Sequence, residues 1–295
     1  MRLFPFLVLM RPANIVTAIS DIVAGVAIAG VLSFGFSSIQ ISDFVYLILS
    51  TIGLYGGGIV FNDVFDVEID KVERPERPIP SGKVTYKQAV FLGSFLLFFG
   101  VGFASLVSIV SMLIAIAIVI ASLVYDKYAK HHIIAGPLNM GICRGLNLLL
   151  GMSILSGQLP GFWMICFIPI VFIAAITLTS QGEVLGNNKM SITFALSLDL
   201  IVAGVIILLA WNGIMNFWTV LPFVLLWITM NLSAKLKAIT TNEPKFIMRA
   251  VKMGVLSLIP LNASYVAGFS NWTYGLAVLL LLPISIILSK KFAVT

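Results

Sequence analysis

The feature that most constrains this fold is a succession of long apolar segments that fills most of the chain. Of the 295 residues, 60% are hydrophobic and only 10% are charged, which is too apolar for a soluble domain with one buried core. Several segments are long enough to cross a hydrocarbon layer about 30 Å thick. The ten that we identify are 13–34, 43–62, 88–107, 109–125, 138–156, 161–180, 191–210, 216–234, 247–267 and 272–289. The sequence therefore predicts an all-α integral membrane protein with nine or ten transmembrane helices, formed by residues 1–295 as one domain.

The basic residues are distributed asymmetrically between the expected loops. The loops near 35–42, 157–160, 211–215 and 268–271 contain no Lys or Arg. The alternate loops carry basic residues, among them those of 63–87, Lys127, Lys130, Lys189 and the stretch 235–252. By the positive-inside rule, both termini and every charged loop face the cytoplasm, in the plasma (inner) membrane. Because topology accounts for the net charge of +6, no nucleic-acid binding is predicted.

A cluster of carboxylates follows the second apolar segment, in the run Asn62-Asp63-Val64-Phe65-Asp66-Val67-Glu68-Ile69-Asp70. A charge at the edge of a membrane segment costs roughly 2.5 kcal/mol or more, so a group of like charges implies a cation that they hold. In a helix, Asn62, Asp66 and Asp70 fall within an arc of about 80° on one face. Oxygen ligands without His or Cys favour a hard cation such as Mg²⁺, which takes further ligands from phosphate. The alternative is a solvated cluster that caps the helix.

The acidic run continues into a segment rich in proline and arginine, residues 71–82. Its three prolines prevent a continuous helix, so the chain turns and brings Arg74 and Arg77 back over the carboxylates. Metal and guanidinium together suit a diphosphate, because they neutralise an anion at the membrane. A plain salt bridge is the alternative interpretation.

Charged residues also lie inside the predicted membrane segments. Asp21 is seven residues after Asn14 and shares its helix face, so it either faces a cavity or bonds to a neighbouring helix. Arg144 lies within a segment, where an arginine is functional by default, and we expect it to bind a carboxylate or phosphate of an acceptor. Asp199 has no evident partner in the sequence.

These motifs resemble those of the UbiA-type intramembrane prenyltransferases. Asn62-Asp63, Asp66 and Asp70 match the first family motif, and Arg74-Pro75-Glu76-Arg77-Pro78-Ile79-Pro80-Ser81-Gly82 matches the segment that follows it. Arg11-Pro12 with Asn14, and Tyr125 with Lys130, match further positions. The string around Tyr125 and the segment 136–145 resemble the EboC-like branch of the superfamily. The resemblance implies helices around a central cavity that is open to lipid.

The sequence departs from the family pattern at two places. The second family motif usually supplies two carboxylates after the sixth span, whereas this chain has Glu183 with Asn187. The depletion leaves open how a second Mg²⁺ is held. Tyr125 and Lys130 are also one residue further apart than in the usual Tyr-x-x-x-Lys form.

The resemblance implies a transferase that moves an isoprenyl group from an isoprenyl diphosphate to an aromatic or other lipophilic acceptor, among membrane lipids. Asn62, Asp66, Asp70 and Glu183 would bind Mg²⁺, and Asp66, Asp70, Lys130 and Tyr125 would act in catalysis. The diphosphate would be held by Asn14, Arg74, Arg77 and Lys130. Asp21 and Arg144 would lie on the acceptor side. A non-catalytic isoprenoid-binding protein and a secondary transporter are the alternatives.

Overall fold

The computed structural model describes residues 3–35, 37–130, 132–155, 161–181 and 188–292, and these form helices joined by short loops. The longer helices are α2 (Pro12–Ile28), α4 (Ser38–Phe65), α6 (Tyr86–Val107), α7 (Ile109–Val124), α8 (Ala135–Met152), α9 (Phe167–Ser180), α10 (Lys189–Trp211), α11 (Phe217–Thr241) and α12 (Pro244–Phe269). The shorter ones are α1 (Phe4–Met10), α3 (Val31–Phe34), α5 (Val67–Glu73), α13 (Trp272–Leu279), α14 (Leu281–Lys291), a π-helix η1 (Tyr125–Ala129) and a 3₁₀ turn η2 (Trp163–Cys166). The all-α prediction is confirmed.

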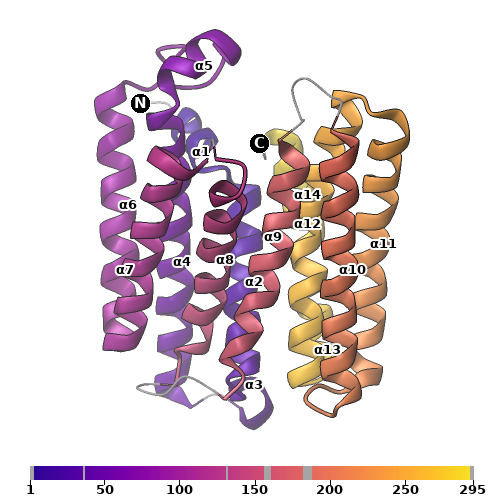
Figure 1. The fold of residues 1–295 in the computed structure, drawn as a ribbon. Helices are drawn as coiled ribbons and strands as arrows, with labels where there is room; N and C mark the ends of the chain where they lie inside the picture. Colours follow the sequence, from indigo (N-terminus) through magenta and orange to yellow (C-terminus); the bar gives the residue numbers. More distant parts are fainter. Residues whose placement is uncertain (1–2, 36, 131, 156–160, 182–187, 293–295) are drawn as a thin grey trace.

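Each of the ten segments expected from the sequence coincides with a helix or a pair of consecutive helices. Within the described ranges, eight helices are long and apolar enough to cross a membrane, or nine if the bent pair α1–α2 is one span. Helix α8 is not among them, since its 18 residues include Arg144, two asparagines and four glycines. In Figure 1 it nevertheless runs alongside α2 and α9.

The helices alternate in direction, so chemically related loops meet at one end of the bundle. Figure 1 shows both chain ends and α5 at one end, and α3 at the other. Contacts bring the polar loops together at the α5 end. Lys130 forms an ion pair with Asp66, and the Nε2 of Gln181 donates to the carbonyl of Ile133 at 3.2 Å. The loops after α4 and α7 and the C-terminal end of α9 therefore share one face of the molecule.

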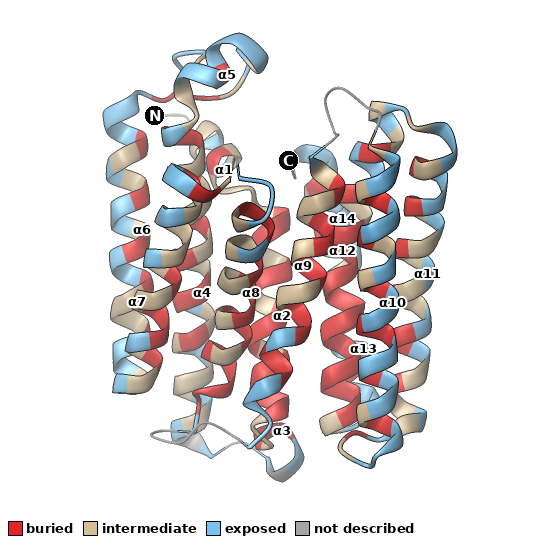
Figure 2. Cartoon of the chain, in the orientation of Figure 1, coloured by how far each residue is buried: buried red, intermediate tan, exposed pale blue. Residues whose placement is uncertain are grey.

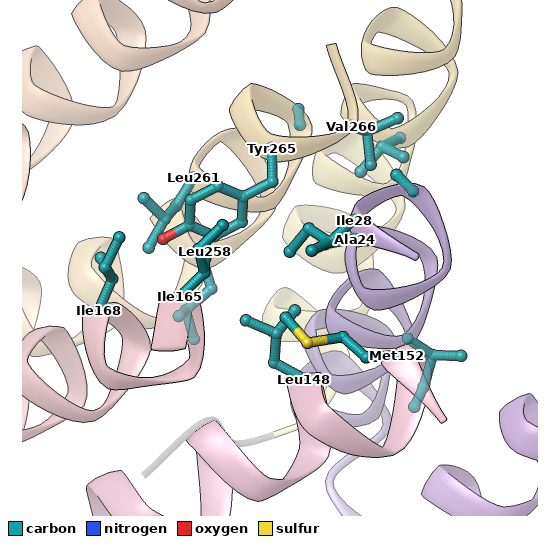
Figure 3. Close-up of a cluster of buried hydrophobic side chains, with 14 of the residues drawn as sticks. Ala24, Ile28, Leu148, Met152, Ile165, Ile168, Leu258, Leu261, Tyr265 and Val266 are labelled. Atoms are coloured by element: carbon teal, nitrogen blue, oxygen red, sulfur yellow. The ribbon is translucent and has the colours of Figure 1, made fainter. Parts of the chain in front are cut away.

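Helices α2 and α12 form the centre of the bundle, and the outer helices surround them. In Figure 2 most of α12 is buried, whereas α6, α7, α10 and α11 present exposed residues on their outer sides. Those residues are largely apolar, for example Phe98 at 77% exposure and Trp218 at 78%. Exposed apolar belts of this kind suit a lipid environment. Figure 3 shows the core where Ala24, Leu148, Ile165, Leu258 and Tyr265 meet, drawing on α2, α8, η2 and α12.

Close backbone contact fixes α2 against α8. A Cβ on Gly25 would lie 2.4 Å from the carbonyl oxygen of Leu148, and one on Gly151 would lie 2.6 Å from that of Ile22. Small residues at such crossings let membrane helices approach closely and pack by van der Waals contact. This crossing fixes the position of α2, whose first turn carries Asn14 and is preceded by Arg11.

Candidate functional site

The predicted acidic face is built where α4 passes into α5. Helix α4 ends at Phe65, but the backbone register continues, since Asp66 N–H donates to Asn62 at 3.0 Å and Asp70 N–H to Asp66 at 2.8 Å. Helical i to i+4 bonding therefore runs through the break, and the side chains of Asn62, Asp66 and Asp70 line the same cavity. The structure thus brings together the three residues whose spacing predicted a common face.

Asp63 has a different environment from its three neighbours. It is 4% exposed, and its Oδ1 forms ion pairs with Nη2 of Arg11 at 2.7 Å and with Nη1 of Arg77 at 3.3 Å. Arg11 reaches it because the chain bends by 49° between α1 and α2, where Arg11 adopts a left-handed conformation (φ 46°) directly before Pro12. Asp63 therefore holds two arginines at the cavity mouth.

The proline-rich segment folds back as the sequence predicted. The turn is closed by hydrogen bonds from Gly82 to Ile79 and from Val84 to Pro78, both 3.0 Å, with Gly82 at φ +73°. Ile79 and Val84 are buried against the α4–α6 contact, which anchors the turn. Arg77 consequently reaches back to Asp70, with Nη1 2.6 Å from Oδ2.

Arg74 lines the cavity but differs from its neighbours in its ion pairing. Arg11, Arg77 and Lys130 each contact an aspartate, whereas Arg74 has no carboxylate within 4.0 Å among the described residues. Of the cavity-lining cations in the described ranges, Arg74 has its guanidinium most available to an anionic ligand.

The unusual spacing of Tyr125 and Lys130 is explained by the π-helix η1. Its i to i+5 bond runs from Lys130 N–H to the carbonyl of Tyr125 at 3.0 Å. A π turn holds one more residue than an α turn, so residues five apart lie on one face. Tyr125, Asp126 and Lys130 accordingly line the cavity, while Tyr128 is exposed. The π turn thus accommodates the additional residue between Tyr125 and Lys130, and Lys130 still forms its ion pair with Asp66.

The cavity has a volume of about 450 Å³ and joins a polar mouth to an apolar interior. Asn14 lines the polar part, from the first turn of α2. The apolar part is contributed by α4, α7, α8, α9 and α12, through Leu54, Ile118, Met140, Ile173, Ile176, Val251, Val255 and Leu258. A polar end beside an apolar pocket suits an amphiphile with a charged head and a hydrocarbon chain.

The charges that line the cavity are balanced. Four carboxylates line the cavity, from Asp66, Asp70, Glu73 and Asp126, together with four cations, from Arg11, Arg74, Arg77 and Lys130. An incoming diphosphate would therefore add uncompensated negative charge at the membrane. Within the described ranges no three His, Cys, Asp or Glu side chains converge on one metal position. The oxygen donors present fit a Mg²⁺ ion that keeps waters and takes other ligands from phosphate.

For Asp21 the structure shows the second alternative, a bond to neighbouring helices, while the acceptor-side role of Asp21 and Arg144 stays a prediction. Neither residue belongs to the cavity lining. They form a buried ion pair instead, with Nε 2.6 Å from Oδ2 and both side chains 2% exposed. Asn147 and Asn262 also donate to Asp21, at 2.9 and 2.6 Å. The pair joins α2 to α8, and the Asn262 hydrogen bond adds α12; charged residues inside membrane segments commonly pair with one another in the bundle interior in this way.

Other residues differ from the sequence interpretation or were missed by it. Asp199 does have a partner, since the Nζ of Lys235 on α11 lies 2.6 Å from its Oδ2. Asp126 and Glu73 were not predicted as cavity residues; for Asp126 the available signal was its place between Tyr125 and Lys130. Glu183 lies outside the described residues.

The comparison with protein families decides the chain's relationship. The family model described as the UbiA prenyltransferase family matches residues 22–234. The chain belongs to the UbiA prenyltransferase family. The family resemblance identified from the motifs is thereby confirmed, and membership together with the apolar helices makes the chain an integral membrane protein. The resemblance to the EboC-like branch stays a prediction.

Similar proteins in the UbiA family include digeranylgeranylglyceryl phosphate synthases. That of Sulfurisphaera tokodaii is 34% identical over 127 residues, covering 42% of this chain and 44% of that protein. That of Metallosphaera sedula is 31% identical over 179 residues, covering 60% of each. The chain spans about half the length of these curated relatives.

Solved structures share the fold over almost the whole chain. A digeranylgeranylglyceryl phosphate synthase structure has a TM-score of 0.68 at 21% identity, covering 90% of this chain and 98% of that one. A UbiA homologue from Archaeoglobus fulgidus bound to GPP and Mg²⁺ has a TM-score of 0.62 at 14% identity, covering 93% and 99%. At these identities the likeness establishes the fold alone.

Proposed function

We propose that this protein is a Mg²⁺-dependent intramembrane prenyltransferase that moves an isoprenyl group from an isoprenyl diphosphate to a lipophilic or aromatic acceptor. The observation that carries the proposal is the juxtaposition of Asn62, Asp66 and Asp70 with four basic side chains at the mouth of an apolar cavity. Relatives named for a product with geranylgeranyl groups and a homologue bound to GPP and Mg²⁺ support the same donor class.

The residues divide into those that bind the head group and those that accommodate the chain. Asn62, Asp66 and Asp70 are the proposed Mg²⁺ ligands, with Glu183 assisting a second ion. Arg74, Arg77, Lys130 and Asn14 are the proposed contacts of the diphosphate. The apolar wall formed by α7, α9 and α12 would hold the isoprenoid. Bound Mg²⁺ would supply positive charge to the diphosphate oxygens.

The proposed reaction breaks the bond between C1 of the isoprenoid and the diphosphate oxygen, and the electron pair leaves with the diphosphate. An allylic cation develops at C1, the acceptor's nucleophilic atom bonds to C1, and the acceptor loses a proton. Arg74, Arg77 and Lys130 stabilise the charge that grows on the leaving group, and such preorganised electrostatics usually makes the largest contribution to catalysis. Tyr125 lies beside Lys130 on the same cavity face, where its hydroxyl is placed to contact the leaving group.

We further propose that this polar mouth faces the cytoplasm in the plasma (inner) membrane, because the loops that form it hold the basic residues. The transporter alternative is disfavoured by the same arrangement, since the cavity's charges gather at one end and not along a pathway.

The experiment is incubation of the purified protein with farnesyl or geranylgeranyl diphosphate, Mg²⁺ and a membrane-lipid extract that supplies the acceptor, with release of diphosphate as the readout. A prenyltransferase releases diphosphate and consumes acceptor. Donor binding without release would indicate an isoprenoid-binding protein, and neither binding nor release would reject the proposal.

A further inference from the structure

Asp126 is a cavity carboxylate that the proposed mechanism does not use. It lies in η1, 4% exposed, and lines the cavity beside Asn62. A carboxylate in this position is expensive, because a buried charge with few partners is poorly solvated. Its presence therefore requires an explanation beyond helix packing.

The contacts of Asp126 are one-sided. Its Oδ1 accepts a hydrogen bond from the Nδ2 of Asn62 at 2.8 Å. Its Oδ2 is buried and has no hydrogen-bond partner among the described residues. Lys130, the nearby cation, is already engaged with Asp66. The carboxylate is thus left without full compensation inside the protein.

The bond to Asp126 determines what Asn62 offers to the cavity. An amide has two donors on nitrogen and acceptor capacity on oxygen. With Nδ2 held by a carboxylate, the amide orientation is fixed and Oδ1 remains for another partner. Carboxylates that hydrogen-bond a metal ligand in this way orient the ligand and strengthen it as a donor.

We infer that Asp126 is a positioning residue of the cation site, acting through Asn62. The inference rests on the proposed function, because Asn62 is a ligand only if the site binds a divalent cation. The carboxylates of Asp66, Asp70 and Asp126 do not converge on one metal position within the described ranges, which favours a role outside the ligand shell.

The test measures Mn²⁺ binding to the purified full-length protein in the presence of inorganic pyrophosphate, by electron paramagnetic resonance of the free ion. Asp126→Asn keeps the size of the side chain and an oxygen for Asn62 but removes the charge, so the Mn²⁺ affinity should fall roughly tenfold or more. Asn62→Ala should weaken binding as well. The double variant Asn62→Ala/Asp126→Asn should bind Mn²⁺ no more weakly than Asn62→Ala alone, because Asp126 acts on the ion only through Asn62. Glu68→Gln, on an exposed side chain paired with Lys71, is the matched control and should bind as wild type.

Thermal unfolding of the metal-free protein is a second readout. If Asp126 served only to stabilise the fold, Asp126→Asn would lower the thermal stability of the metal-free protein. Removing a poorly compensated buried charge should leave the metal-free Asp126→Asn protein at least as stable as wild type, while the stabilisation by Mn²⁺ shrinks. A metal-free variant that is less stable or does not fold, an unchanged Mn²⁺ affinity, or additive effects in the double variant would overturn the inference.

If wild type binds no Mn²⁺, the proposed function fails too. If wild type binds and Asp66→Ala abolishes binding while Asp126→Asn does not, only the inference fails.

Discussion

At the scale of single residues, two kinds of buried charge must be distinguished. Asp66 and Asp70 are paired with Lys130 and Arg77 yet line a cavity, so a ligand has access to them. Asp21 and Arg144 are equally charged but are enclosed by neighbouring helices. Access, and not charge alone, separates a site from a structural pair.

The first prediction concerns the acidic face. Asp66→Ala or Asp70→Ala should lower diphosphate release at least about a hundredfold, because each removes charge that acts chiefly on the transition state. Steady-state release of diphosphate from a fixed isoprenyl diphosphate measures this effect. Glu68→Gln, an exposed acid of α5 that is outside the cavity lining, should retain normal release. Wild-type rates in either alanine variant would contradict the assignment.

Arg74 gives a prediction about donor binding. Because it has no carboxylate partner among the described residues, its guanidinium is free to make a charge-assisted bond to phosphate, which contributes about 1.5–3 kcal/mol. Arg74→Ala should therefore reduce kcat/KM for the donor roughly tenfold or more. Lys71→Ala, an exposed residue paired with Glu68, is the control. Equal kcat/KM for the two variants would remove Arg74 from the site.

Asp21 and Arg144 give a prediction about stability. Arg144→Ala leaves a buried carboxylate without its partner, a change that costs about 3–5 kcal/mol. Unfolding of the purified protein in detergent should show this loss, and adding Asp21→Asn should restore much of it. If Arg144→Ala is as stable as wild type but has lower activity toward one acceptor, Arg144 binds the acceptor instead.

Among the secondary-structure elements that form the site, some features could be predicted from the sequence and others could not. The spacing of Asn62, Asp66 and Asp70 predicted a common face because helical hydrogen bonding continues through the break at Asp66. The Pro-rich turn was equally predictable, since proline and glycine restrict local conformation. The role of η1 was not predicted: the longer spacing of Tyr125 and Lys130 was visible in the sequence, but the contact of Asp126 with Asn62 joins residues 64 positions apart. The pairing of Asp21 with Arg144, and of Asp199 with Lys235, likewise joins residues far apart in the chain.

The arrangement of loops leads to a prediction about topology. In a variant without Cys143 and Cys166, single cysteines at Glu76, Lys127 and Lys189 should resist impermeant thiol reagents in intact cells, because these loops share the proposed cytoplasmic face. A cysteine at Asn212, in the loop between α10 and α11, should be labelled from outside. Labelling of any of the first three in intact cells would contradict the shared orientation.

At the scale of the whole molecule, composition and charge asymmetry were sufficient to predict a bundle of membrane helices. The positions of the ten segments followed from apolar length alone, and each coincides with a helix or a pair of consecutive helices, although α8 does not pass as a span by length and composition. Which helices enclose the cavity did not follow, because the packing of α2 against α8 depends on backbone approach at Gly25 and Gly151. The site therefore depends on local motifs, which the sequence reveals, and on the packing of the helices that brings those motifs together, which the local sequence does not specify.

A Mg²⁺ titration of diphosphate release by the wild-type protein in proteoliposomes, with geranylgeranyl diphosphate as donor and EDTA as the metal-free condition, shows whether the reaction depends on a bound divalent cation. Because the carboxylates and cations of the cavity mouth balance each other, the diphosphate requires added positive charge. Release should rise with Mg²⁺ and fall to background in EDTA. Equal release in EDTA and in Mg²⁺ would contradict the account.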